Sequence, residues 1–235
     1  PDMGTGAIIV AMCLAPYIAA GLPRTEWAAL IVACVSMTVL FISRYAYRAE
    51  RVWAWLNPAA YAQTSGYQPT QALLAIGSGG VKGTGLGLGA SKFYYLPEAH
   101  TDFAFAIWAQ ETGFIGAVVV LALVGAMACY GVKIAMESAD GRGRILAIGI
   151  VFMIVGQAVG NTAMVVGLIP VTGVPMPFFS YGGSAMMINF MAIGLLISVA
   201  VESARRGRRT GARPAEEVIR RPKQRLTERL RQRIR

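Results

Sequence analysis

The sequence predicts an all-α, polytopic helical membrane protein, and three observations lead to that fold class. The 235 residues are 55% hydrophobic and only 14% charged, whereas an ordinary soluble domain has about 25% charged residues. The apolar residues gather in long runs, and a run of about 20 residues can cross a bilayer as a helix. The 27 glycines suit membrane helices, in which small residues let neighbouring backbones approach closely.

Five apolar segments are predicted to span the membrane within a membrane domain over residues 1–201. These spans are 7–21, 27–43, 103–132, 145–168 and 185–201. The first is short for a span, and the third is long enough to tilt or to begin outside the hydrocarbon. The chain begins at Pro1 without a methionine, so we expect it to be part of a longer protein.

The basic tail determines the expected orientation. Residues 202–235 carry 13 Lys/Arg and 4 Asp/Glu, a balance of +9, whereas residues 1–201 are close to neutral. Basic residues beside a span favour the cytoplasmic side, so we expect a cytoplasmic tail and a large extracytoplasmic loop over 44–102. Contact with anionic membrane lipids is favoured for the tail, and no nucleic acid is expected as a partner.

A short amphipathic helix is predicted where the outer loop begins. Arg44, Arg48 and Arg51 recur at spacings of four and three, which would place them on one helical face, and Asn57-Pro58 would end the helix. Two functions stay open for these arginines. They could anchor the helix by reaching the lipid headgroups, or they could clamp a phosphate-bearing lipid.

The glycine-rich segment 77–89 carries Lys82 but does not fit a nucleotide site. It lacks the Gly-Lys-Ser/Thr ending of a phosphate-binding loop, and no predicted strand precedes it. We expect its backbone to pack closely against the spans or to approach a substrate.

Polar side chains inside the predicted spans mark a buried interior. Gln157 and Asn161 lie one turn apart in the fourth span, and hydrogen bonds between helices are the favoured role for both. Glu111 lies in the third span, where a structural pair or the lining of a cavity is favoured over direct chemistry.

A polar run precedes the third span and brings Glu98, His100 and Asp102 to the membrane rim. Taken alone, Thr101 or Asp102 is best explained as the N-cap of the following helix. His100 alone is best explained as an interface residue. No second histidine or spaced cysteine supports a metal site, so none is predicted.

The Pro- and Gly-rich segment 169–184, which includes Ser180 and Tyr181, lies on the same outer face as Asp102 in the expected topology. Such irregular backbone is tolerated at a membrane where it is buried in protein or lines a wet cavity. Two irregular segments that converge on one face suggest a single site.

Ordered motifs along almost all of residues 1–201 resemble the FtsW/RodA/SpoVE, or SEDS (shape, elongation, division and sporulation), family. They are Pro-Asp-Met-Gly-Thr at 1–5, Tyr-Arg-x-x-Arg-Val at 47–52, Gly-Tyr-Gln at 66–68, Ala-Ile-Gly-Ser-Gly-Gly at 75–80, Leu-Pro-Glu-Ala-His-Thr-Asp-Phe at 96–103, Gly-Leu-Ile-Pro-Val-Thr-Gly at 167–173 and Ser-Tyr-Gly-Gly-Ser at 180–184. The resemblance is closer to FtsW and SpoVE than to RodA, and it does not cover the tail. Gln110-Glu111-Thr112 departs from the family by having one acid where two are usual.

The resemblance implies the second half of a ten-span protein in the bacterial cytoplasmic membrane. It implies a peptidoglycan glycosyltransferase that polymerises lipid II into glycan strands at the outer face, during cell division or cell-shape maintenance. The implied partners are lipid II, the growing glycan strand and a class B penicillin-binding protein (a transpeptidase). We expect this part of the protein to be inactive on its own.

The family also implies roles for individual residues. Its motif acid, here Asp102, is regarded as catalytic, and a carboxylate can accept a proton from an attacking sugar hydroxyl. Cations can stabilise the departing pyrophosphate, and a divalent cation (Mg or Mn) could share that task. The substrate-binding candidates are Arg48, Arg51, Lys82, Glu98, His100, Ser180 and Tyr181.

Two other functions remain open at this point. A lipid II transporter, or flippase, would use Glu111, Gln157 and Asn161 as a polar path through the membrane. Alternatively, this half of the protein could serve only as a scaffold that docks the penicillin-binding protein.

Overall fold

The computed structural model describes residues 23–44, 46–92, 96–138 and 140–209, together with the single positions 6, 10 and 14. Within these ranges every regular element is a helix, so the all-α prediction is confirmed. The elements in chain order are α2 (Arg24–Arg44), α3 (Ala46–Leu56), η1 (Pro58–Tyr61), α4 (Tyr67–Gly79), η2 (Ala90–Lys92), α5 (Ala104–Met136), α6 (Gly141–Val165) and α7 (Gly183–Arg209).

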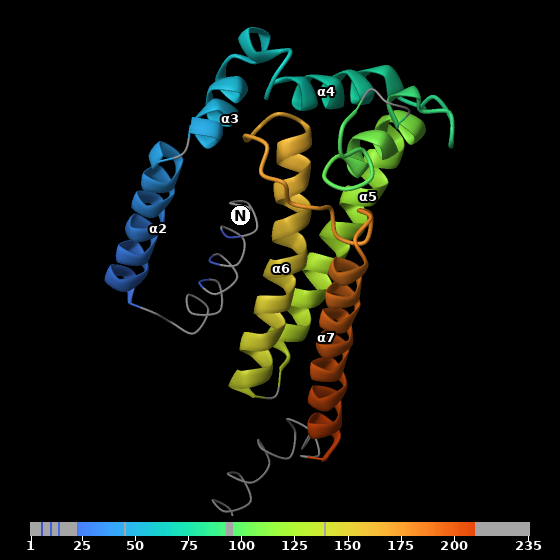
Figure 1. Ribbon diagram of the computed structural model, residues 1–235. Coiled ribbons are helices and arrows are strands. Elements are labelled where there is room, and N and C mark those ends of the chain that lie inside the picture. The colour runs from blue at the N-terminus through green and yellow to red at the C-terminus, as the bar shows by residue number, and fades with distance from the viewer. Residues whose placement is uncertain are drawn as a thin grey trace, which may run out of the picture.

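A bundle of α5, α6 and α7 forms the centre of the molecule (Figure 1). In the described part of the chain, three helices are long and apolar enough to cross a membrane: Ala104–Met136, Gly141–Val165 and Gly183–Arg206. They correspond to the third, fourth and fifth predicted spans. Each of the three helices extends past its predicted span at one end at least, because hydropathy marks the apolar part of a helix and not the full length of its hydrogen-bonded backbone.

The first two predicted spans have different outcomes. Span 7–21 lies outside the described residues, apart from its positions 10 and 14. Span 27–43 corresponds to α2, whose continuous apolar stretch is the shorter Ala28–Leu40. Helix α2 stands beside the bundle and contacts α3 (Figure 1).

The segment 44–102 is not an open loop, because it contains α3, α4 and two short 3₁₀ turns. Helix α4 lies across one end of the bundle, here called the site end (Figure 1). Its buried residues are Ala72, Ala75 and Gly79, which let it approach α5 closely. A stripe of such small residues gives little hydropathy signal, which is why the sequence did not predict this helix.

The predicted amphipathic helix is present as α3 and ends before Asn57-Pro58 as expected, but it excludes Arg44. Arg44 is the last residue of α2, and α3 begins only at Ala46. The prediction that Arg44, Arg48 and Arg51 share one helical face stays a prediction, because Tyr45 between the two helices and the side chain of Arg48 lie outside the described residues.

A kink in α5 joins this helix to the glycine-rich segment. Gly113 has a φ of 71° and a ψ of −168°, a conformation that only glycine adopts readily. The kink frees backbone groups of α5, so that Thr84 N donates to Gln110 O (3.0 Å) and Phe114 N donates to Gly80 O (2.9 Å). This pairing confirms the expectation that the glycine-rich backbone packs closely against a span.

Glu111 holds the same segment in place. Its carboxylate accepts hydrogen bonds from Gly87 N (2.9 Å) and Gly89 N (3.4 Å). Buried Gln110 donates to Ser78 Oγ at 2.9 Å. The expected structural role of Glu111 is therefore confirmed.

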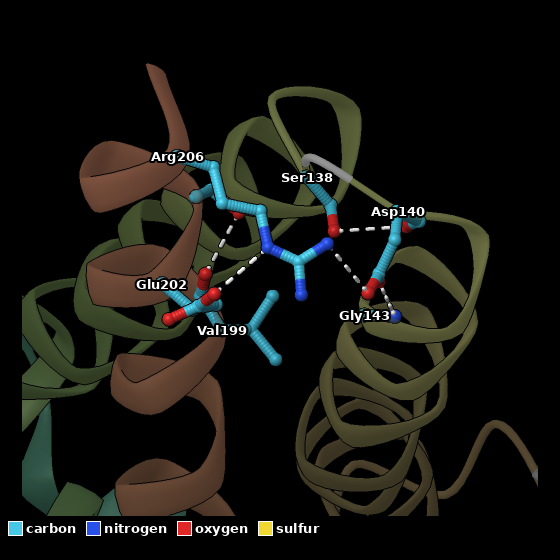
Figure 2. Close-up of polar contacts among 7 residues, drawn as sticks. Ser138, Asp140, Gly143, Val199, Glu202 and Arg206 are labelled. Carbon is cyan, nitrogen blue, oxygen red and sulfur yellow. Dashed lines mark hydrogen bonds and ion pairs between the residues drawn. The ribbon is translucent and has the colours of Figure 1, made fainter. Parts of the chain in front are cut away.

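Charged side chains link α6 and α7 at the opposite end of the bundle, here called the tail end (Figure 2). Asp140 caps α6 by accepting from Gly143 N at 2.6 Å. Arg206 on α7 lies 3.5 Å from Asp140 and donates to Glu202 at 2.8 Å. The α5–α6 turn is thereby tied to the last turns of α7, while residues 210–235 of the predicted tail lie outside the described residues.

Candidate functional site

Two irregular segments meet at the site end, as predicted. One is the turn over residues 96–103 before α5, and the other is the stretch over residues 166–182 between α6 and α7. Tyr181 N donates to His100 O at 2.7 Å. Ser180 Oγ donates to Thr101 O at 2.6 Å and accepts from Met176 N at 2.7 Å. Ser180 therefore holds its own segment in a turn and joins it to the residue before Asp102.

Asn161 of α6 forms hydrogen bonds with both irregular segments. It is fully buried in α6, and its Nδ2 donates to Asp102 O at 2.6 Å and to Val174 O at 2.8 Å. Hydrogen bonding was the expected role of Asn161, but its partners are the two irregular segments rather than another helix. Because backbone carbonyls buried in a membrane protein need donors, this one amide satisfies both segments at the point where they converge.

Helix α5, which follows Asp102 in the chain, has a different N-cap residue than predicted. The N-cap of α5 is Phe103, which has no capping side chain, so the assignment of Thr101 or Asp102 to the cap is wrong. Phe103 is fully buried in a core cluster with Met164 and Met176. Burial of this ring fixes where the helix starts, and Thr101 Oγ1 instead donates to Glu98 Oε2 at 2.7 Å.

A cavity of about 280 Å³ opens where α6, α7 and the two irregular segments meet. Asp102, which is half-buried, belongs to its lining. The other lining residues with polar or aromatic side chains are Thr101, Gln157, Phe178, Ser180, Tyr181 and Asn189. The site therefore combines one carboxylate, two amides, the hydroxyls of a threonine and a serine, and two aromatic rings in a partly apolar setting, which is the usual composition of a ligand pocket.

The structure brings together only some of the predicted site residues. Asp102, Ser180 and Tyr181 line the cavity, whereas the exposed residues Glu98 and His100 do not.

Neither Lys82 nor Arg51 belongs to the described cavity lining. Exposed Lys82 lies in the glycine-rich segment. Arg51 reaches the second irregular segment, where its Nη1 donates to Val171 O at 3.2 Å. The side chain of Arg48 lies outside the described residues.

Asn189 is the site residue that sequence reasoning missed. It is only 5% exposed and lies on α7 within the span predicted at 185–201. The available signal was a single amide in an otherwise apolar run, the same signal that drew attention to Gln157 on α6. A polar residue within a span marks the bundle interior or a wet cavity by default.

No metal-binding cluster is formed by the described residues, since no three His, Cys, Asp or Glu side chains come together there. The described cavity lining offers Asp102 as its only acid. Divalent Mg²⁺ or Mn²⁺ would need further oxygen ligands, so these residues do not make a dedicated site for such an ion.

The fold and the cavity together define a polytopic helical membrane protein with a carboxylate in a pocket at one end of its bundle. A family model described as "Cell cycle protein" and named for FtsW, RodA and SpoVE matches residues 1–205. The chain belongs to this SEDS family.

Curated relatives agree with that assignment. Stage V sporulation protein E of Bacillus subtilis is 41% identical over 200 residues, which are 85% of this chain and 55% of that protein. The probable peptidoglycan glycosyltransferase FtsW of Coxiella burnetii is 38% identical over 207 residues, 86% of this chain and 55% of the relative. The chain thus spans about half the length of the curated relatives that it matches.

Solved structures share the fold. One is described as "Structural coordination of polymerization and crosslinking by a peptidoglycan synthase complex"; it has a TM-score of 0.70 and 27% identity, covering 86% of this chain and 56% of that chain. The rod shape determining protein RodA of Thermus thermophilus has a TM-score of 0.56 and 27% identity, covering 86% of this chain and 50% of that chain.

Proposed function

We propose that the protein to which this chain belongs is a peptidoglycan glycosyltransferase that polymerises lipid II into glycan strands. The observation that carries the proposal is the half-buried carboxylate of Asp102 in the lining of the cavity at the site end. The names of relatives such as FtsW, a probable peptidoglycan glycosyltransferase, support the same activity.

Asp102 would serve as the proton acceptor in this reaction. A sugar hydroxyl of one substrate attacks the anomeric carbon of the other, and its proton passes to the carboxylate. A new C–O bond forms as the bond between the anomeric carbon and the lipid pyrophosphate breaks, and the pyrophosphate leaves with the bonding electrons. The hydrogen bond from Asn161 to the Asp102 carbonyl holds the backbone of the acid in place, which favours a constant distance to the hydroxyl.

The departing pyrophosphate needs positive charge, and the described cavity lining contains neither lysine nor arginine. The described candidates, Arg51 and Lys82, therefore lie outside the cavity lining. Arg51 is the best placed of them, because it already contacts the segment over 166–182 that lines the cavity. Lys82 and Arg48 remain candidates on their position in the sequence alone.

We place the site end at the outer face of the bacterial cytoplasmic membrane and the tail end in the cytoplasm. The basic residues of the tail support this orientation. A class B penicillin-binding protein is the proposed partner, because a similar solved structure belongs to a complex that coordinates polymerization and crosslinking.

Polymerisation is better supported than transport of lipid II. Two of the three polar groups that would suit a transport path, Glu111 and Asn161, are instead used to hold backbone amides and carbonyls. A scaffold function alone would not require an acid in a cavity.

The test uses the full-length protein in complex with its penicillin-binding protein and purified lipid II. Asp102→Asn should lower the rate of glycan polymer formation by at least about 10²-fold, because the amide cannot accept the proton. Glu137→Gln is the matched control. It removes an exposed carboxylate near the tail end that only approaches Lys133 (3.9 Å), and it should leave the rate unchanged.

Two results would count against the proposal. If a folded Asp102→Asn complex formed glycan polymer at the wild-type rate, Asp102 would not be the proton acceptor. Movement of lipid II across vesicles by the wild-type complex, without any polymer, would favour the transporter instead.

A further inference from the structure

Helix α3 is joined to the second irregular segment by two hydrogen bonds. Trp55 Nε1 donates to Gly167 O at 2.9 Å, and Arg51 Nη1 donates to Val171 O at 3.2 Å. The two donors lie four positions apart on α3, so they share one face of that helix, and the two acceptors are also four positions apart in the chain. In Figure 1 the start of the segment reaches away from α6 toward α3.

The second irregular segment depends on donors from other elements for its path. Its three prolines have no N–H to donate, and residues 170–176 belong to no helix or strand. Side chains hold its carbonyls instead: Gly167 and Val171 are held from α3, and Val174 is held by Asn161 of α6. The stretch before the cavity is therefore held mainly by α3, and the stretch at the cavity by α6.

This segment also forms one wall of the cavity. More than half of the lining residues belong to it, from Gly173 to Gly182. Asp102 belongs to the other irregular segment, where its carbonyl is held by Asn161. A shift of the stretch held by α3 would therefore change the shape of the cavity while the support of the acid stays in place.

We propose that Trp55, together with Arg51, is a positioning residue that holds the second irregular segment in the arrangement that binds the substrate. This inference rests on the proposed function and deepens it by giving α3 a part in substrate binding. Trp55 acts through the segment, since it does not belong to the described cavity lining. If the bond to Gly167 is lost, the binding-competent arrangement is less populated, and the apparent affinity falls by the same factor.

The first test measures steady-state polymerisation of lipid II by the full-length complex carrying Trp55→Phe, which keeps an aromatic ring and removes the N–H donor. KM should rise roughly fivefold, as expected for the loss of one hydrogen bond, while kcat changes less. The melting temperature should fall by no more than about 4 °C. A merely structural role would lower the melting temperature and leave the KM of the folded protein unchanged.

Trp53→Phe is the matched control, because it makes the same change in the same helix. Trp53 lies two positions from Trp55, about 200° around the helix, and its side chain is 59% exposed. The control should leave KM unchanged. Arg51 is not used in the kinetic test, since it is also a candidate for stabilising the pyrophosphate.

The second test observes the segment directly and does not depend on polymerisation. A nitroxide spin label is attached at Leu168→Cys in a full-length protein without other cysteines. This position is 69% exposed and lies between the two carbonyls that α3 holds. The label should become more mobile in Trp55→Phe and in Arg51→Gln, and it should not change in Trp53→Phe.

Equilibrium binding of lipid II in nanodiscs, measured on Asp102→Asn with and without Trp55→Phe, completes the test. We expect roughly fivefold weaker binding when Trp55 is replaced. Unchanged label mobility in both the Trp55 and the Arg51 variants would show that α3 does not hold the segment. A more mobile label with unchanged KM and binding would show that the segment is held but does not position the site. Weaker binding and a more mobile label, in a protein whose wild type makes no polymer, would support this inference and refute the glycosyltransferase.

Discussion

At the residue scale, Asn161 is the side chain on which the geometry of the site depends most. Its Nδ2 holds the carbonyls of Asp102 and Val174, which belong to different irregular segments. Without this amide, both carbonyls would lose the same donor at once. The structure thus gives a reason for a polar residue deep in α6 that does not itself line the cavity.

Asn161→Ala should lower both stability and catalysis. We expect a loss of about 2–4 kcal/mol in the free energy of unfolding, from two buried hydrogen bonds and the carbonyls left without donors. We also expect a fall in kcat of at least tenfold with a smaller change in KM, because a small displacement of the acid slows reaction more than binding. Thermal unfolding in detergent and polymerisation kinetics measure the two effects.

The control for this variant is the next residue, Thr162→Ala. The Thr162 hydroxyl bonds only the Ala158 carbonyl of its own helix among the contacts described, at 2.8 Å, so its loss should change little. An Asn161→Ala protein with normal kcat would show that the irregular segments hold Asp102 without this amide.

At the residue scale, the sequence predicted site residues that stand in polar or irregular segments. It did not predict hydrogen bonds between residues that lie far apart in the chain. Asp102, Ser180 and Tyr181 could be identified because they stand in polar or irregular sequence. The backbone partners of Asn161 could not be predicted, since they lie 13 and 59 positions away in the chain. Asn189 was overlooked because one amide hardly changes the hydropathy of a long apolar run.

At the element scale, the kink of α5 joins a membrane helix to the segment that precedes it. A side chain at Gly113 would bring its Cβ to 2.3 Å from Gly83 N and 2.5 Å from Val81 O, which are backbone atoms that cannot move aside. The sequence predicted a continuous helix here. Hydropathy does not detect a kink, because it measures the apolar character of the side chains and not the conformation of the backbone.

Gly113→Ala should therefore destabilise the protein by about 2–4 kcal/mol, from the strained positive φ and the backbone clash. Gly125→Ala is a matched control in the same helix. Its Cβ would meet nothing within 4 Å, and alanine favours a helix by about 1 kcal/mol over glycine. The pair is compared by thermal unfolding in detergent. Equal melting temperatures for the two variants would mean that the kink is not required.

At the scale of the whole molecule, α6 is the helix around which the rest is arranged. The apolar window of α6 is 39% buried, compared with 11% for α5 and 17% for α7. It carries Asn161 and Gln157 in its C-terminal third, and its N-cap Asp140 is at the tail end (Figure 2). The most buried helix thus supplies polar groups at both ends, where helices leave backbone groups without partners.

The two ends are expected to act independently, and Arg206→Ala tests this. The Arg206 side chain is about half exposed in its contacts with Asp140 and Glu202, and exposed ion pairs contribute little to stability. Polymerisation by the full-length complex should stay within about twofold of wild type, and the melting temperature should hardly change. The same assay run on Asn161→Ala should give the opposite result, because that residue holds the two irregular segments at the site end. A tenfold loss of polymer from Arg206→Ala, with the fold intact, would mean that the junction of α6 and α7 at the tail end controls the cavity at the other end of the same two helices.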